Sequence, residues 1–164
     1  MSATKKTKAV PCGACGKGVF KPTNVKGQDF PHRDEPALLL SVDIMIPTCT
    51  ACGEMRETSV HIQALDAALE PVYQARRAAM TAEFVERLVS AGWHQGEIEQ
   101  VMGLSMGYLS KVLRGEKLLA GSTLRQLMHV ALHPRQALRD LTPHDPQMRA
   151  LQARLERRGA LAAA

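Results

Sequence analysis

The chain has 164 residues, of which 45% are hydrophobic and 4% aromatic, and its formal net charge is +5. This length allows one ordinary domain or two small ones, and the apolar fraction is typical of a folded protein. Because no apolar run reaches the roughly 18 residues of a membrane span and the basic N-terminus has no apolar signal segment, we expect a cytoplasmic protein without a membrane partner.

The excess positive charge is confined to the second half of the chain. Residues 1–70 carry eight Lys and Arg and eight Asp and Glu, whereas residues 71–164 carry thirteen Lys and Arg against eight Asp and Glu. A neutral half followed by a basic half indicates that only the second half meets a polyanion.

The first chemical motif is a repeated pair of cysteines, which follows a polar tail, residues 1–10, that we expect to be disordered. Cys12 and Cys15 are separated by two residues, and the same spacing recurs at Cys49 and Cys52. Each pair offers two thiolates from one turn, and two such turns complete the tetrahedral shell of four sulfurs that zinc prefers. We therefore predict one structural Zn²⁺, with two redox-active cysteine pairs as the alternative.

Glycines flank these cysteines at positions 13, 16 and 53. Their small size lets backbone amides turn toward the sulfurs, and such hydrogen bonds favour the charged thiolate. With four cysteine ligands the site has no open position for a catalytic water, so the metal is expected to stabilise the fold.

The segment between the cysteine pairs predicts a small amount of β-structure. Alternation of apolar and other residues over 38–46 predicts one strand that runs into the second pair. Residues 18–36 contain Pro22, Gly27, Pro31 and Pro36, so we expect a loop or a short irregular hairpin there. We expect its polar residues 32–35 to form a solvated turn, with a polar contact surface as the alternative. Residues 11–70 are thus predicted to form a zinc-ribbon-like α+β domain.

The chain then becomes helical. We expect a linker helix over residues 54–75 that is interrupted near Pro71, since proline disfavours helical geometry at the preceding residue, with the domain boundary at about residue 70. A second helix is expected to begin with Thr81 as its N-cap and to end near Gly92. A later helix is expected to begin with Ser122 as its N-cap and to end before Pro134.

Residues 93–115 have the pattern of a helix-turn-helix motif. Gly103 lies where the chain must reverse, Ser105 is placed to N-cap the second helix, and Gly115 is placed to end it in a left-handed conformation. Such a motif puts its second helix into the major groove of DNA. We therefore predict an all-α helix-turn-helix domain of four to five helices over residues 71–145, followed by a C-terminal helix and tail at 146–164.

The segment 81–133 resembles the helix-turn-helix of the lambdoid phage repressor (XRE) superfamily. The resemblance rests on the residues that occupy its conserved places: Gln95, Gly103, Ser105, Ser110 and Gly115. It implies that Gln95 and Ser105 contact phosphates, that Met106, Gly107 and Lys111 meet base edges, and that Arg114 contacts the DNA backbone.

The chemistry of the residue types agrees with part of this assignment. Residues 106, 107, 110, 111 and 114 share one predicted exposed face of the second helix, on which Lys111 can donate to guanine and Met106 can press on a thymine methyl. Arg114 and Lys117 suit phosphates. Tyr108 can stack on a sugar or donate to a phosphate, with a half-buried ring as the alternative.

Glu99 replaces the small residue that is usual at its place in this superfamily, where that residue faces the second helix of the motif. We therefore expect its carboxylate to turn out to solvent or the two helices to pack less closely.

The order of the two halves adds a second resemblance. Over residues 11–140 the chain is similar to the MqsA-type antitoxin family, which joins a four-cysteine zinc domain to a helix-turn-helix. This resemblance implies a zinc domain that binds a ribonuclease toxin and a dimeric C-terminal domain that represses its own operon from a palindromic operator. The family's base-reading Asn and Arg correspond to Gly107 and Lys111 here, so a different operator is expected.

Two other functions stay open at this stage. One is a regulator that acts alone and whose zinc module senses metal or oxidants. The other is a zinc-ribbon adaptor for protein or RNA, in which the helical half only docks proteins. We expect no enzyme activity, because the sequence offers no nucleophile–base pair and no open metal site.

Overall fold

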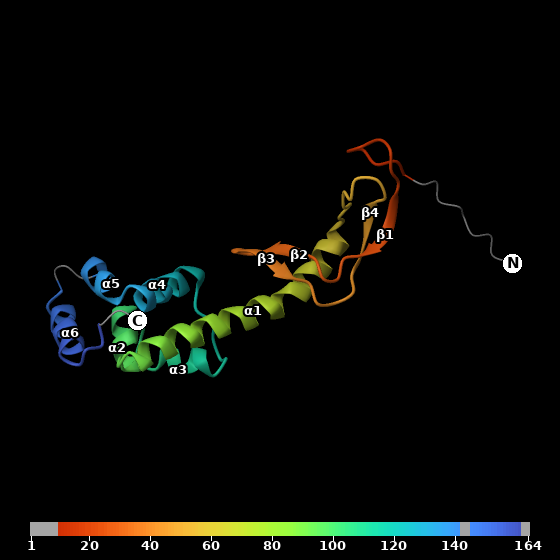
Figure 1. The fold of residues 1–164 in the computed structure, drawn as a ribbon. Helices are drawn as coiled ribbons and strands as arrows, with labels where there is room; N and C mark the ends of the chain where they lie inside the picture. The colour runs from red at the N-terminus through yellow and green to blue at the C-terminus, as the bar shows by residue number, and fades with distance from the viewer. Residues whose placement is uncertain (1–9, 142–144, 162–164) are drawn as a thin grey trace. The chain divides into compact units, whose positions relative to one another are not determined.

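The computed structural model describes residues 10–141 and 145–161. Residues 1–9 of the predicted tail at 1–10, residues 142–144 and residues 162–164 lie outside this part. Within it, four short strands precede six helices (Figure 1). A small β region followed by a helical region agrees with the predicted order of fold classes. No helix in the described part is long and apolar enough to cross a membrane.

The strands form two antiparallel pairs. β1 (Phe20–Asn24) pairs with β4 (Met45–Cys49), and β2 (Asp29–His32) pairs with β3 (Glu35–Leu39). The single strand expected over 38–46 is therefore wrong, since the chain leaves one pair and enters the other within that range. Side-chain alternation does not distinguish one strand from two that are joined by an extended bend.

Residues 18–36 are more regular than their prolines suggest, since they contain both β1 and β2. Pro22 lies opposite Pro47 in the β1–β4 register. Proline cannot donate to a ladder, but each of these sheets has only two strands, so both strands are edge strands, which tolerate proline.

α1 (Ser59–Ser90) continues through Pro71, so the predicted interruption is wrong. A proline inside a helix removes one hydrogen bond and crowds the preceding turn. Leu69 and Tyr73, on either side of it, are buried against the β region, and this packing outweighs the local preference. Thr81 is not an N-cap either, because it lies inside α1 and its Oγ1 donates to the carbonyl of Arg77 at 2.8 Å.

The chain divides into two compact units, and the division falls inside α1, between Tyr73 and Gln74. Unit 1 contains the strands and the first half of α1. Its core is a single buried cluster of apolar side chains: Val25, Phe30, Leu38, Leu40, Ile46, Leu65, Leu69 and Tyr73.

Unit 2 contains the second half of α1 and five shorter helices: α2 (Gln95–Val101), α3 (Tyr108–Leu113), α4 (Gly121–Leu132), α5 (Pro134–Leu141) and α6 (Pro146–Arg157). All six contribute to one core around the buried Trp93, whose indole Nε1 donates to the carbonyl of Ala160 at 3.1 Å. α4 ends before Pro134 as predicted. Its N-cap, however, is Ala120 instead of Ser122, and no side chain caps it.

Candidate functional site

The four cysteines converge in unit 1. Their sulfur atoms all lie within 4.8 Å of one another, and two of the separations, Cys12 to Cys52 and Cys15 to Cys49, are 3.7 Å. One tetrahedral ion with metal–sulfur bonds of about 2.3 Å requires sulfur atoms about 3.8 Å apart. The free thiols are therefore already spaced to hold one metal ion.

Backbone amides surround the sulfur atoms, as the flanking glycines predict. The amides of Lys17 and Gly18 lower the pKa of Cys15 to about 6, and those of Ala51 and Cys52 lower the pKa of Cys49. These amides stabilise thiolates, which are the form that binds metal.

Cys52 behaves differently from its neighbours. The amide of Glu54 favours its thiolate, but the adjoining sulfurs and burial outweigh that contribution and raise the pKa of Cys52 to about 12. The cause is mutual repulsion, because closely spaced sulfurs cannot all be negative without a cation. The cluster thus has the electrostatics of a metal site.

Gly18 is a second requirement of this site that sequence reasoning missed. A Cβ atom at this position would lie 2.4 Å from the sulfur of Cys49 and 2.8 Å from the backbone nitrogen of Ala51. Real Cβ atoms do not approach other atoms this closely, so only glycine lets the first cysteine turn approach the second. Spacing alone carries no signal for this contact.

In unit 2, α2 and α3 are two short helices joined by a turn, at the place where the sequence predicts a helix-turn-helix. α2 ends at the left-handed Gly103, and α3 ends at the left-handed Gly115, with φ angles of 64° and 77°. After α3, the amides of Gly115 and Glu116 donate to the carbonyls of Val112 and Lys111, which is the Schellman arrangement. The predicted end of the second helix is confirmed.

The start of α3 differs from the prediction. The helix begins at Tyr108, its N-cap is the left-handed Gly107, and the side chain of Ser105 does not cap it. Ser105 contributes only its carbonyl, which accepts from the amide of Tyr108 at 3.0 Å. Met106 and Gly107 therefore belong to the turn before α3 and not to the helix itself.

Glu99 on α2 supplies the missing cap. Its carboxylate accepts from the amide of Gly107 at 2.9 Å and from the amide of Leu109 at 2.8 Å. The residue is only 2% exposed, so the expectation that it turns out to solvent is wrong. A buried carboxylate is stable where hydrogen bonds satisfy it, and here it joins α2 directly to the first turn of α3.

Gln95 extends the same network. Its side-chain nitrogen Nε2 donates to Ser110 Oγ at 2.7 Å and to Glu99 Oε1 at 3.2 Å. Both hydrogens of this amide are therefore used within the protein, and only the side-chain oxygen of Gln95 is not engaged by these bonds. This arrangement makes Gln95 a residue that positions α3.

The remaining predicted DNA contacts are mostly on the surface. Met106 is 93% exposed, and Ser105 and Lys111 are also exposed. Arg114 is exposed but forms an ion pair with Glu116 at 2.6 Å, and Lys117 Nζ lies 5.3 Å from the centre of the Tyr108 ring. The segment from Lys111 to Lys117 thus presents three cations beside an exposed methionine, and the ring of Tyr108 is half-buried.

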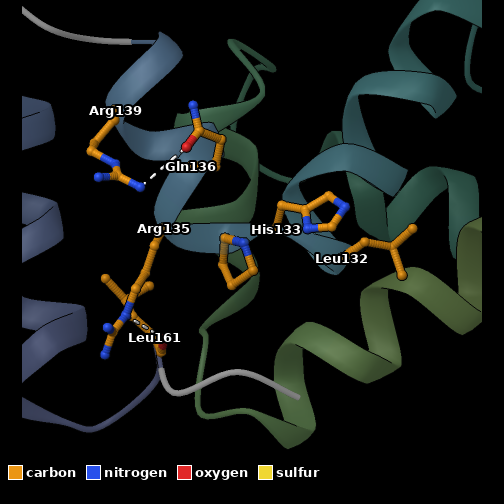
Figure 2. Close-up of a pocket in the computed structure, with 7 residues that line it drawn as sticks. Leu132, His133, Arg135, Gln136, Arg139 and Leu161 are labelled. Carbon is orange, nitrogen blue, oxygen red and sulfur yellow. Dashed lines mark hydrogen bonds between the residues drawn. The ribbon is translucent and has the colours of Figure 1, made fainter.

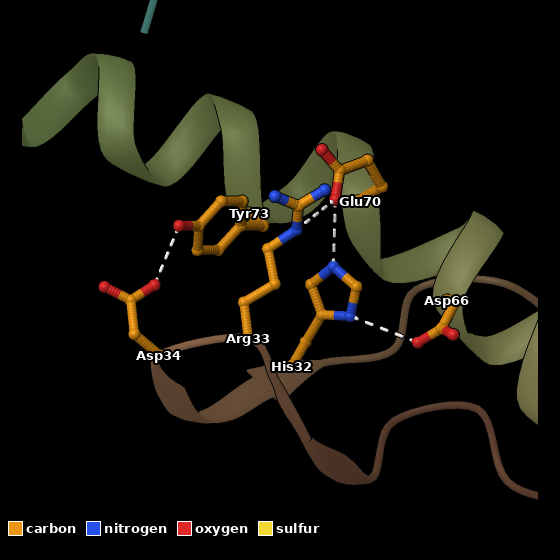
Figure 3. Close-up of polar contacts among 6 residues, drawn as sticks. All are labelled: His32, Arg33, Asp34, Asp66, Glu70 and Tyr73. Carbon is orange, nitrogen blue, oxygen red and sulfur yellow. Dashed lines mark hydrogen bonds and ion pairs between the residues drawn. The ribbon is translucent and has the colours of Figure 1, made fainter. Parts of the chain in front are cut away.

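Unit 1 contains a polar cluster that the sequence analysis treats as a solvated turn (Figure 3). The imidazole of His32 is buried, and its Nε2 lies 3.0 Å from Glu70 on α1, while Tyr73 donates from its hydroxyl to Asp34 at 2.7 Å. Arg33 donates from Nε to Glu70 at 2.9 Å. The β2–β3 turn is therefore attached to α1, and the solvated interpretation is wrong.

A pocket of about 500 Å³ lies at the start of α5 in unit 2 (Figure 2). Its two arginines are both engaged within the protein: Arg135 donates to the carbonyl of Leu161 at 2.8 Å, and Arg139 donates to Gln136 Oε1 at 3.1 Å. The pocket contains none of the residues predicted to bind metal or DNA, and we assign it no function.

Comparison with models of protein families and with curated proteins finds no match to this chain. The geometry of the two units, and the resemblances carried by the cysteine pairs and by residues 81–133, are therefore the support for a function.

Proposed function

We propose that this protein is a sequence-specific, DNA-binding transcriptional repressor with a zinc-holding N-terminal unit. The observation that carries the proposal is the motif in unit 2. A buried carboxylate joins α2 to α3, and the exposed surface of that junction carries Met106, Lys111, Arg114 and Lys117. A supported helix with a basic, exposed face is the arrangement that major-groove recognition requires.

Within this proposal the cations have different roles. Lys111 lies on α3 and donates to guanine edges, whereas Arg114 and Lys117, at and beyond its end, contact phosphates. Met106 meets thymine methyl groups. Gly107 has no side chain for base contacts, so part of the specificity comes from DNA shape.

The metal of unit 1 is zinc in this proposal. Four sulfur ligands in a tetrahedral arrangement are typical of structural zinc sites, and this one has no ligand position left for a substrate. The ion stabilises unit 1, and unit 1 then serves as a protein-interaction module.

The partner of that module is a toxin protein if the resemblance to the MqsA-type antitoxins extends to function. One structural observation supports such a partner: unit 1 exposes large apolar side chains at Leu39, Met45, Val60 and Ile62. Apolar side chains on a surface favour contact with another protein. The same resemblance supports a homodimer that binds a palindromic operator in the cytoplasm and represses its own operon.

The test is selection of preferred duplexes from a random library by the full-length protein, followed by titrations of a selected and a random duplex. Lys111→Ala should weaken binding of the selected duplex by roughly 10- to 100-fold, the equivalent of about 1–3 kcal/mol, with little effect on random DNA. Arg114→Ala should weaken binding of both duplexes and flatten the salt dependence.

Lys26→Ala, which removes the same charge from unit 1, is the matched control and should bind like the wild type. No enrichment of any duplex sequence would refute the proposal, and equal losses on both duplexes for both variants would contradict the division of roles.

A second function has one observation in its favour. Cys52 is exposed at the surface, so oxidants and chelators can reach the metal ligands directly. A metal- or redox-responsive regulator predicts that operator affinity changes when zinc is removed or peroxide is added. The antitoxin proposal predicts a change only when the partner protein is added.

A further inference from the structure

α6 lies outside the part of the chain that resembles known antitoxins, yet it is attached to the helix–turn–helix. Leu151 and Leu155 are fully buried in the core of unit 2, and Arg158 forms an ion pair with Glu97 in the first turn of α2. The carbonyl of Ala160 accepts from Trp93, immediately before α2. These contacts hold α6 at a fixed position beside α2.

Between α2 and α6 lies an open groove of about 500 Å³. It is lined by Gln100 of α2 and by five residues of α6: Gln147, Ala150, Ala153, Arg154 and Arg157. Among the described residues no acidic side chain lines this groove, and both arginines are exposed. The other lining residues are small alanines and uncharged glutamines. The groove therefore has room for an anionic group beside the two guanidinium groups.

These two arginines differ in their partners from Arg158, which follows them in the chain, and from Arg114. Among the described residues, no hydrogen bond or ion pair engages the guanidinium groups of Arg154 and Arg157, whereas those of Arg158 and Arg114 have carboxylate partners. Arginine donors in a fixed fork suit phosphate oxygens. Because α2 also carries Gln95, which bonds to α3, the groove lies on the same motif as the proposed DNA-reading surface.

We infer that the α2–α6 groove is a second DNA-backbone contact, in which Arg154 and Arg157 bind phosphates flanking the base pairs that α3 reads. The inference rests on the proposed DNA binding and extends the interface beyond the helix–turn–helix. Its ligand is the phosphate backbone of duplex DNA, so it adds affinity and orientation without reading sequence.

The test compares full-length variants on a random-sequence duplex over a series of KCl concentrations. Arg154→Ala/Arg157→Ala removes two phosphate contacts, so the slope of log K against log[KCl] should decrease by about 1.8 per bound protomer, that is, 2 × 0.9. Arg154→Lys/Arg157→Lys keeps both charges and should retain most of the slope. Arg149→Ala on the same helix, whose side chain does not line the groove, should leave the slope unchanged.

A wild-type slope in the double alanine variant, or an equal decrease in Arg149→Ala, would overturn the groove as a contact. If the lysine variant loses the slope as the alanine variant does, charge is not what the groove supplies and the inference also fails. Failure of the proposed function is distinguishable, because the wild-type protein itself would then bind no duplex. Thermal unfolding followed by Trp93 fluorescence verifies that the variants are folded.

Discussion

Both units are organised by anions that accept hydrogen bonds from backbone amides, but the two anions are neutralised in different ways. In unit 1 the amides of Lys17, Gly18 and Ala51 point at thiols crowded within 4.8 Å of one another. In unit 2 the amides of Gly107 and Leu109 point at the single carboxylate of Glu99. Thiolates crowded this closely repel one another, so a bound cation would stabilise them, whereas one carboxylate is satisfied by its hydrogen bonds.

Backbone amides thus surround an acidic group in both units, but the two units differ in whether they need a partner from outside the chain. Under the proposed function, unit 1 depends on a bound metal ion, because four clustered thiolates need a cation to offset their charge. Unit 2 is complete by itself, since no basic side chain among the described residues forms an ion pair with Glu99 and none is needed to satisfy it. Four experiments separate these dependences.

The largest expected effect is that of metal removal. Apparent free energies of structural zinc binding are about 10–16 kcal/mol at neutral pH, so a chelator should unfold unit 1, including the turns of α1 from Ser59 to Tyr73. Unit 2 should retain its helices and its cooperative melt. Hydrogen exchange resolved by segment is the measurement. Equal protection of unit 1 amides with and without chelator would refute the dependence on metal.

The second effect is the loss of the Glu99 cap. Glu99→Gln leaves an amide NH₂ facing one of the two backbone amides, so one buried donor is unsatisfied at a cost of about 1–3 kcal/mol. Thermal unfolding of unit 2, followed by Trp93 fluorescence, should shift to lower temperature, with zinc content unchanged. Glu116→Gln, an exposed carboxylate near the end of the same motif, is the control and should barely change the melt. Unchanged unfolding of Glu99→Gln would show that the cap contributes nothing.

The third effect concerns the close approach of Gly18 to the second cysteine turn. Gly18→Ala would place a methyl group 2.4 Å from Cys49 Sγ, so the turns must move apart. Zinc affinity should decrease by roughly 10- to 100-fold, as for other losses in the surroundings of a metal site. Gly13→Ala is the matched control, because a Cβ there meets no atom within 4 Å. Competition with a chromophoric chelator measures both affinities, and equal values would contradict the steric argument.

The smallest effect is a pH dependence of unit 2. Burial alone would raise the pKa of Glu97, but the bond from Arg158 and the amide of His94 outweigh it, and the pKa is lowered from 4.5. A carboxyl with a lowered folded-state pKa stabilises the fold fully above its unfolded value of about 4.3, and this contribution is lost as the pH falls through the folded value. Unit 2 should therefore lose stability on acidification below about pH 4.5.

Glu97→Gln separates this contribution from other acid effects. The variant should be less stable at neutral pH and should show a shallower decline between pH 5 and pH 3, measured by urea unfolding with Trp93 fluorescence. An identical decline in variant and wild type would assign the acid sensitivity to other groups.

The sequence predicted the features that depend on neighbours along the chain. Two-residue spacing identified the cysteine pairs, and glycine at 103 and 115 identified the ends of α2 and α3, because a left-handed residue is a local requirement. The order of a β region and a helical region was also correct. In each of these cases the physical cause lies within a few residues of the signal.

The wrong predictions concern features that depend on contacts with residues farther away in the chain. Glu99 caps amides eight and ten residues away, a distance that no capping motif encodes, and Ser105 has the favoured residue type but does not make the bond. The helix through Pro71 survives because of packing that sequence pattern does not reveal. His32 is buried by contacts with Asp66 and Glu70, which lie more than thirty residues further along the chain.

α1 has a consequence for how the protein loses its structure. One helix contributes Leu65 and Leu69 to the first core and Phe84 and Leu88 to the second, so its costly nucleation serves both. Pro71 has no amide hydrogen to donate to the carbonyl of residue 67, so one backbone hydrogen bond of α1 is missing. This gap lies just before the division between the units, which falls after Tyr73. Fraying that begins at Ser59 meets this gap first. We therefore expect loss of structure in the first unit to stop near the proline, so that the second unit stays folded.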